Sequence, residues 1–365
     1  MATADTTTVD TTTVDTTRLD TTGVDAATID ASTIVLGIET SCDETAVAVV
    51  MGGTDVLSSV VSSQLDEHAR FGGVVPEIAS RAHLESLPHV TAEALERARI
   101  DYSRVDAVAA TVGPGLVGAL LVGVSAAKTT ALALGVPFVG VNHLEAHLYA
   151  ALLDEPRAEF PLLFVLVSGG HTLLVEMRDT HSYRVIGQTI DDAAGEAFDK
   201  VARFLGLPFP GGPAIDKAAL HGNERAINFP RAMLNDGLDV SFSGLKTAVI
   251  NHVRANPQVA TDDVAASFQR AVVDVLVHKA CRAARDVGAR TIALGGGVAA
   301  NSLLRRELAA AGAAEGLAVV LPSCEMCTDN AAMIASAGWY RLARGESSTL
   351  DAGANPNLKL GTGQR

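Results

Sequence analysis

Two histidines, His143 and His147, stand four residues apart in a segment rich in helix-forming residues. Four residues make slightly more than one helical turn, so both rings would project from the same face of a helix. Two neutral imidazoles in that arrangement can hold one metal ion, and the alternative is two unrelated core or surface histidines. The spacing therefore identifies a candidate metal site.

The glutamate between the two histidines bears on the chemistry of this site. Glu145 lies about 200° around the helix from His143, so its carboxylate would point away from both rings. In the helical zinc-protease signature His-Glu-x-x-His, the glutamate directly follows the first histidine and reaches the metal-bound water. The sequence therefore favours a metal site without a water-activating base, and it indicates a supporting or structural role for Glu145.

Other metal-ligating residues occur further along the chain. Asp329, in the stretch Cys-Thr-Asp-Asn, is a plausible third, oxygen ligand. His171, in a Gly-Gly-His turn, could be a ligand, or it could bind backbone or phosphate. Cys324 and Cys327 form a single CxxC with no second pair nearby, so a structural zinc site is not expected there.

Composition favours an α/β protein. The chain has 365 residues, of which 48% are hydrophobic and only 4% aromatic, and its 33 glycines suggest many tight turns. Strand-like and helix-like segments alternate along it. The longest apolar stretch, Leu116–Ala127, ends at Lys128 and is too short to span a bilayer, so we expect a buried helix. Four cysteines without a disulfide framework and a polar N-terminus fit a reducing cytoplasm without membrane association.

The charge distribution bears on possible partners. The net charge is −14, of which six Asp and one Arg place −5 on residues 1–32 and −9 on the rest. Residues 1–32 repeat Asp every five residues among threonines, a low-complexity pattern that predicts a disordered tail. An acidic chain binds nucleic acid poorly unaided, so an RNA substrate would require local basic patches or a basic partner.

The strand pattern indicates a duplicated domain. Residues 34–39 and 45–51 are predicted to form two strands around a turn rich in hydroxyl and carboxylate groups. Residues 162–167 and 173–177 repeat this layout about 130 residues later, around the turn 168–172. Such turns hold a nucleotide phosphate and its cation in some folds, although each could equally be an ordinary polar turn. The repetition predicts two similar lobes with a cleft between them.

Two glycine-rich loops follow further predicted strands. Gly113–Gly115 follows the strand 105–111, and Gly295–Gly297 follows the strand 291–294. Glycines between a strand and a helix leave backbone N–H groups available to an anion, while any strand-to-helix turn can also contain them. Asn301 is placed either to cap the next helix or to contact a ligand.

Taken together, these stretches resemble one family, the universal tRNA threonylcarbamoyladenosine transferases. The resemblance covers about residues 34–340 and excludes the tail. It depends on motifs that occur in this order: GIETSCDET (37–45), GGVVPE (72–77), GPGLVGALLVG (113–123), NHLEAH (142–147), LVSGGHT (166–172), DDAAGEAFDK (191–200), PGGP (210–213), FSGLKTA (242–248), GGGVAAN (295–301) and CTDN (327–330).

The resemblance implies an α/β chain with an actin/Hsp70-like (ASKHA) fold, in which two ribonuclease-H-like lobes flank a central cleft. The implied N-terminal lobe covers residues 33–158 and the C-terminal lobe residues 159–345. The final helix would pack back on the N-terminal lobe, and residues 346–365 would form a C-terminal tail.

The resemblance also implies a role for each matching position. His143, His147 and Asp329 correspond to ligands of one divalent metal ion, with Fe²⁺ favoured over Zn²⁺. No catalytic base is predicted. The expected contacts to threonylcarbamoyl-adenylate are Leu166, Val167, Ser168, Gly169, Gly170, Asp199, Gly212, Asp216 and Asn301.

The implied activity is transfer of the threonylcarbamoyl group from its adenylate to the N6 amine of the adenosine 3′ of the anticodon, in tRNAs reading ANN codons. AMP would be released. Expected partners are an inactive TsaB-like paralogue and a TsaE-like ATPase. Two alternatives remain open: a metallopeptidase of the glycoprotease type, suggested by the paired histidines, and a kinase or ATPase of the same superfamily, suggested by the glycine loops.

Overall fold

The structure, a computed structural model, describes residues 29–154 and 158–361. Most of the predicted disordered tail, residues 1–28, lies outside this part of the chain. Residues 29–32 differ from the prediction, because they form an ordered turn against the body. The indole Nε1 of Trp339 donates a hydrogen bond to the carbonyl oxygen of Asp30 over 3.2 Å.

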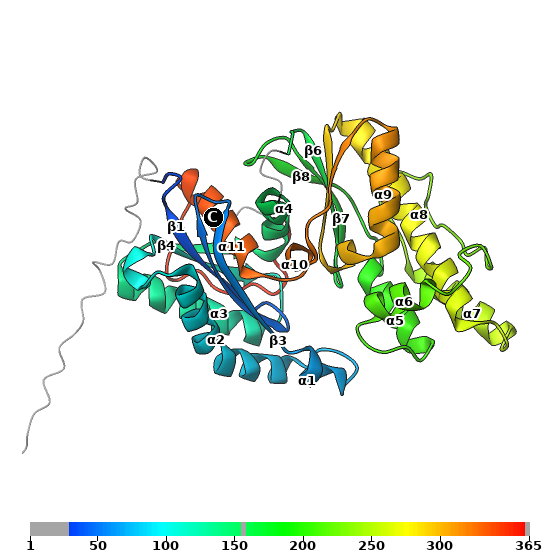
Figure 1. The fold of residues 1–365 in the computed structure, drawn as a ribbon, viewed down its shortest axis with the longest axis horizontal. Helices are drawn as coiled ribbons and strands as arrows, with labels where there is room; N and C mark the ends of the chain where they lie inside the picture. Colours follow the sequence, from blue (N-terminus) through cyan, green and yellow to red (C-terminus); the bar gives the residue numbers. More distant parts are fainter. Residues whose placement is uncertain (1–28, 155–157, 362–365) are drawn as a thin grey trace, which may run out of the picture.

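The N-terminal lobe contains a five-stranded mixed sheet (Figure 1). Its strands are β1 (Ile34–Glu39), β2 (Glu44–Met51), β3 (Asp55–Ser63), β4 (Ala107–Gly113) and β5 (Phe138–Asn142). Their order across the sheet is β3-β2-β1-β4-β5, with β2 antiparallel to both neighbours and the remaining pairs parallel. The central strand β1 is buried on both faces, as its continuous apolar run predicts.

The C-terminal lobe repeats this sheet. Its strands are β6 (Leu162–Val167), β7 (Thr172–Met177), β8 (Tyr183–Gln188), β9 (Thr291–Gly295) and β10 (Ala318–Val320). Read from β8 to β10, the order is β8-β7-β6-β9-β10, with the same strand directions as in the first lobe. This repetition confirms the predicted duplication.

Helices cover both faces of the first sheet. One face carries α2 (Pro76–Ala98) and α3 (Val117–Leu134), with the short α1 (Leu65–Ala69) and η3 (Tyr102–Arg104) nearby. The opposite face carries α11 (Ala331–Ala343), which comes from the far end of the chain and packs on β1 and β2. The N-terminal lobe is therefore completed by residues that follow the C-terminal lobe in sequence.

The helices of the C-terminal lobe lie mainly on one face of its sheet. They are α5 (Ala194–Phe204), α6 (Gly211–Ala219), α7 (Ser243–Ala255), α8 (Thr261–Val287), η4 (Gly297–Ala300) and α9 (Ser302–Ala314), and α10 (Cys324–Cys327) leads back to the first lobe. The other face of the sheet packs on α4 (His143–Asp154). Because α4 also packs on α11, it lies between the two lobes (Figure 1).

Helix α3 differs from the buried helix expected at Leu116–Ala127. It is long and apolar enough to cross a membrane by length and composition, and about a third of it is buried. Ala119, Leu120 and Val124 face the lobe, whereas Val117 and Leu121 are about half exposed. An apolar helix covering a lobe passes the same test as a membrane span, so this feature is weak evidence for a membrane.

The predicted C-terminal tail is also different in the structure. Residues 346–361, which we call the C-terminal strap, lie along the N-terminal lobe. The backbone N–H of Asn355 donates to the carbonyl oxygen of Val112 over 2.7 Å, and Leu358 is buried in the core. Gly113 has a φ of +152°, and a Cβ at this position would collide with the Asn355 carbonyl oxygen. The strap is therefore an ordered part of this lobe.

Candidate metal centre

The two histidines lie at the start of α4, directly after β5. The side-chain oxygen of Asn142 accepts hydrogen bonds from the backbone N–H groups of Leu144 and Glu145, over 2.8 and 3.3 Å, and so begins the helix. Helical spacing then places the rings of His143 and His147 side by side, with centroids 4.8 Å apart. Both side chains are buried between the lobes.

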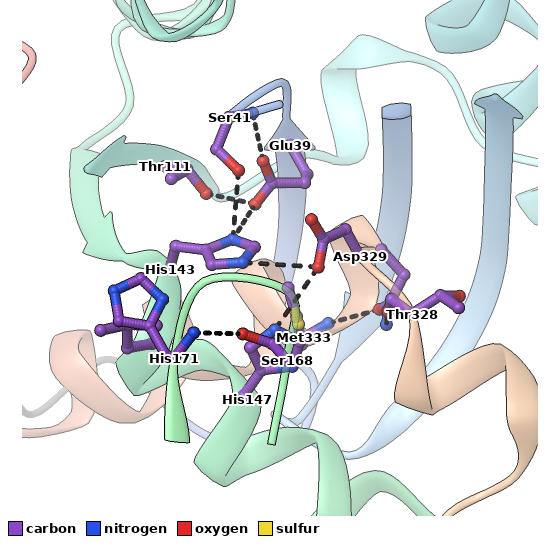
Figure 2. Close-up of polar contacts among 12 residues, drawn as sticks. Glu39, Ser41, Thr111, His143, His147, Ser168, His171, Thr328, Asp329 and Met333 are labelled. Carbon is purple, nitrogen blue, oxygen red and sulfur yellow. Dashed lines mark hydrogen bonds and ion pairs between the residues drawn. The ribbon is translucent and has the colours of Figure 1, made fainter. Parts of the chain in front are cut away.

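Asp329 reaches the same point from the opposite end of the chain. It follows α10 and precedes Asn330, whose side chain caps α11 by accepting from the N–H of Met333 over 3.0 Å. One carboxylate oxygen of Asp329 lies 3.4 Å from the Nε2 atoms of both His143 and His147 (Figure 2). The structure thus brings together the three residues that the sequence suggests as metal ligands, and their ligand atoms lie within 4.8 Å of one another.

The donor atoms fit one small divalent ion. A distance of 3.4 Å is too long for a good hydrogen bond, and neither ring nitrogen of His147 has a hydrogen-bond partner among the described residues although both are buried. Ligands bound at ~2.1 Å in a tetrahedral arrangement are separated by ~3.4 Å. Two imidazoles and one carboxylate suit Fe²⁺ and Zn²⁺ alike.

A second carboxylate orients the first histidine. Glu39, at the end of β1, accepts a hydrogen bond from Nδ1 of His143 over 2.9 Å. Its two oxygens also accept from the hydroxyl of Thr111 over 2.6 Å and the backbone N–H of Ser41 over 2.5 Å. Because a carboxylate only accepts, Nδ1 carries the proton and Nε2 faces the other ligands with its lone pair. No role for Glu39 was predicted from the sequence, although a carboxylate at the end of an otherwise apolar strand is an unusual signal.

Charge and burial set the protonation of the three candidate ligands. Burial disfavours the Asp329 anion, but His143 and His147 outweigh this effect and hold its pKa far below its usual range. Burial also opposes protonation of His143, yet Asp329 and Glu39 raise its pKa well above the usual value. Burial lowers the pKa of His147. Without an ion, protons therefore compete for the site mainly at His143.

Glu145 lies away from these ligands, in the direction that the helical phase predicts. Its carboxylate pairs with Arg341 at 3.3 Å and with Arg344 at 3.8 Å, and both arginines belong to the C-terminal end of α11 or the residue after it. The ion pair joins α4 to α11. Its geometry does not place Glu145 where a metal-bound water could be activated.

A cavity of about 540 Å³ lies in the C-terminal lobe beside these ligands. Five of the nine residues expected to contact the adenylate line it: Gly169, Asp199, Gly212, Asp216 and Asn301. Thr328 lines it as well, so the cavity reaches the residue next to Asp329. The cavity therefore extends to the residue that precedes one of the candidate metal ligands.

The other four expected residues lie at the neighbouring β6–β7 turn and do not line this cavity. The side chains of Leu166 and Val167 are buried on opposite faces of the sheet, so only their backbone could serve a ligand. The Ser168 hydroxyl accepts from the N–H of His171 over 3.1 Å and stabilises the turn, of which Gly170 is part.

Hydrogen bonds hold the polar residues of the cavity in place. Asp216 accepts from the hydroxyl of Ser302 over 2.8 Å and from the side-chain amide of Asn301 over 3.3 Å. Asn301 also caps α9 by accepting from the N–H of Leu304 over 2.9 Å. Asp199 accepts from the N–H of Gly211, at the start of α6, over 2.7 Å, and burial raises its pKa. Two helix N-termini thus face the cavity, and N–H groups of their first turns already donate to Asp199, Asp216 and Asn301.

Comparison with known proteins identifies close relatives. A family model described as tRNA N6-adenosine threonylcarbamoyltransferase matches residues 55–336. A protein of that name from Moorella thermoacetica is 56% identical over 331 residues, covering 89% of this chain and 97% of the relative. Another from Caldicellulosiruptor saccharolyticus is 52% identical over 331 residues, covering 90% of this chain and 98% of the relative.

Solved structures share the architecture at low sequence identity. Full-length HypF has a TM-score of 0.60 at 14% identity, with 88% of this chain and 48% of HypF covered. Component A of (R)-2-hydroxyglutaryl-CoA dehydratase from Acidaminococcus fermentans has a TM-score of 0.52 at 15% identity, with 86% of this chain and 100% of that chain covered. These likenesses confirm the actin/Hsp70-like fold and are too distant to indicate an activity.

Proposed function

The chain belongs to the tRNA N6-adenosine threonylcarbamoyltransferase family, and from this we propose its donor, its acceptor and its site. The donor is threonylcarbamoyl-adenylate, and the acceptor is the N6 amine of the adenosine 3′ of the anticodon in tRNAs reading ANN codons. The observation that carries the proposal is that a nucleotide-sized cavity extends to Thr328, whose neighbour Asp329 lies with His143 and His147 in one cluster of possible metal ligands.

We assign the adenylate to the cavity in the C-terminal lobe, which we call the adenylate cavity. Its glycine-lined wall allows close approach to the backbone, and Asp216 and Asn301 offer side-chain contacts there. With AMP in this cavity, the threonylcarbamoyl group would extend past Thr328 towards the two histidines.

His143, His147 and Asp329 would hold one divalent ion, for which we favour Fe²⁺ over Zn²⁺. Such an ion supplies Lewis acidity towards a carbonyl oxygen and a template that fixes the threonyl group. Glu39 keeps the His143 ring in the tautomer needed for binding. Fixed side chains at this buried position also keep water away from the activated donor.

The chemistry explains why an adenylate is needed. The adenine amine is a weak nucleophile because its lone pair is delocalised into the ring. In the transfer, the amine nitrogen bonds to the carbamoyl carbon, and the bond from that carbon to the phosphate oxygen breaks. AMP leaves with the electron pair, and the amine loses one proton. The site contributes by holding both reactants at short range, which can supply several kcal/mol, on the order of 7–11 in favourable cases.

We also propose cytoplasmic action with partner proteins. The excess of acidic residues makes strong unaided binding of tRNA unfavourable, which supports a requirement for a TsaB-like paralogue and a TsaE-like ATPase. A TsaB-like partner would need an apolar surface, and α2 and α3 expose Leu84, Val117 and Leu121 on the N-terminal lobe. Leu84→Asp should weaken that association in gel filtration, whereas Leu220→Asp, an exposed leucine in the other lobe, should not.

The proposed activity is tested by incubating the protein with its partners, unmodified tRNA and threonylcarbamoyl-adenylate. Mass spectrometry of the digested tRNA should show the modified nucleoside, and Asp329→Ala should abolish it together with bound metal. Cleavage of a glycoprotein without tRNA modification would instead support the metallopeptidase. Phosphorylation of a sugar from ATP would support the kinase alternative.

A further inference from the structure

A second cavity, of about 760 Å³, lies close to the candidate metal centre, because Leu144, the residue after His143, lines it. Its walls come from the end of β4, the start of α4, the β7–β8 strands and the C-terminal strap. Side chains that define it include Pro114, Leu144, His171, Leu173, Gln188 and Asn357. The proposed placement of the adenylate leaves this cavity without an assigned ligand.

The two cavities lie against opposite faces of the C-terminal sheet. Leu173, in the second cavity, packs with Leu144 on the face covered by α4. Phe198, in the adenylate cavity, packs on the other face of the sheet. The β6–β7 turn separates the cavities, because Gly169 lines the first and His171 lines the second.

Two residues that line the second cavity, Leu144 and His171, lie close to the metal ligands. Leu144 follows His143 in α4. Burial lowers the pKa of His171, and His143, His147 and Asp329 lie near enough for their charges to influence it as well. Figure 2 shows the His171 ring beside His143, on the side of that ring away from Asp329. A group bound in the second cavity could therefore reach the point where the two cavities meet.

Acyl transfer requires the nucleophile and the leaving group to occupy different positions around the reacting carbon. If AMP occupies the adenylate cavity, the attacking amine must enter from elsewhere. We propose that the second cavity binds the target adenine base of the RNA, unstacked from its loop, with its exocyclic amine towards the metal ligands. This inference depends on the proposed function.

The chemistry of the lining suits a purine base. Within the described part of the chain, the side chains of His171 and Gln188 make no hydrogen bond, so both are available to a ligand. A glutamine amide can pair with two adjacent groups of adenine, and an imidazole offers a flat surface for stacking. Leu173 and Pro114 supply apolar contact. The volume lies in the range common for ligand sites, about 300–1,000 Å³.

The cavity has a fixed wall and an open rim. The N–H of Gly115 donates to the carbonyl oxygen of Pro356 over 3.2 Å, and the side-chain amide of Asn142 donates to the carbonyl oxygen of Lys359 over 3.1 Å. These bonds place Asn357 at the rim, where it and Gln188 are exposed to solvent. A nucleotide extruded from an RNA loop can therefore enter from solvent.

The test uses variants that obstruct the second cavity and leave the adenylate cavity unchanged. Asn357→Trp and Gln188→Trp each place a bulky ring at an exposed rim position, and Ser347→Trp is the matched control on the strap outside the cavity. With partners present, we expect both rim variants to raise the KM for tRNA about tenfold or more, the loss expected when one base loses its site. AMP binding, measured by calorimetry, and metal content should match wild type in all three variants.

A second readout follows the base itself. An anticodon stem-loop RNA with 2-aminopurine at the target position should gain fluorescence with wild type and Ser347→Trp, because the base leaves its stack. That gain should be lost in both rim variants. If wild type modifies tRNA while both rim variants behave like Ser347→Trp, the assignment of this cavity is wrong and the proposed function stands. If wild type modifies no tRNA, the proposed function fails and the assignment fails with it. If Asn357→Trp does not fold, the result with Gln188→Trp alone tests the assignment of the second cavity.

Discussion

Glu39 and His143, 104 residues apart in sequence, are joined by a hydrogen bond of 2.9 Å between Oε2 and Nδ1. The bond connects the end of β1 to the start of α4. It fixes the orientation of the imidazole and directs Nε2 towards the other candidate ligands before any ion arrives. Glu39 is thus a positioning residue, and its effect should be measurable as metal affinity.

Replacing Glu39 with glutamine should weaken metal binding about 10–100-fold, the usual effect of removing such a partner of a ligating histidine. Chelator competition measures the affinity directly. Thr111→Val should have a smaller effect in the same direction, since it removes only one of the hydrogen bonds that hold Glu39. Unchanged affinity in Glu39→Gln would show that the carboxylate does not support the ligand.

Glu145→Gln should leave metal content and transferase activity close to wild type. Burial raises the pKa of Glu145 despite Arg341 and Arg344, so the charge on its carboxylate contributes little net stability. We expect the substitution to cost no more than about 1 kcal/mol, because the amide can still accept a hydrogen bond. Loss of activity with metal still bound would favour a chemistry in which this glutamate acts directly.

Asp216→Ala should raise the KM for threonylcarbamoyl-adenylate about tenfold, the loss expected for one hydrogen bond to a charged group. The KM for tRNA and the metal content should not change, because Asp216 lies in the adenylate cavity, away from the three metal ligands. Asp286→Ala, which removes an exposed carboxylate from α8, is the control. If Asp216→Ala raised only the KM for tRNA, the adenylate would have to bind at another site.

The stabilising effect of Asp191 should depend on pH. Burial opposes its ionisation, but hydrogen bonds from Ser241, Ser243 and the N–H of Phe242 lower its pKa from 3.8 to about 2. A depressed pKa contributes stability that is complete above the unfolded value of 3.8 and is lost as pH falls through about 2. Because this carboxylate is largely exposed, Asp191→Ala should cost about 1 kcal/mol at pH 7.

Urea unfolding at several pH values tests this prediction. The difference between Asp191→Ala and wild type should be constant near neutrality and should shrink below about pH 4. Asp239→Ala, which removes a nearby carboxylate whose oxygen accepts from the N–H of Gln188, is the comparison variant. A difference independent of pH down to 3 would contradict the prediction.

Periodic patterns made much of the fold predictable. The central strands and the long helices have continuous or periodic apolar residues, and the two hairpins repeat visibly. The strands β3 and β8 were missed because both are edge strands, half exposed, without clear alternation of apolar and polar residues. The strap was mistaken for a tail because its order depends on backbone hydrogen bonds to the N-terminal lobe, which leave no local pattern.

In the metal centre, too, features set by local geometry were predictable and features set by long-range contacts were not. The pair His143 and His147 could be predicted because helical geometry links residues four apart. Asp329 was suggested as a ligand by its residue type and by the family resemblance. No local rule connects it to histidines so far away in the sequence. Glu39 was missed for the same reason: its contact with His143 exists only once the sheet and α4 are assembled.

The return of the chain to its first lobe has a consequence for biosynthesis. Helix α11 and the strap are synthesised after the C-terminal lobe, yet they cover one face of the first sheet and close its edge. A nascent chain that stops before residue 331 has an unfinished first half with an exposed apolar face. While Asp329 is still inside the ribosome, such a chain offers only the two histidines to an ion, so the candidate metal site forms only after the C-terminal lobe has been synthesised.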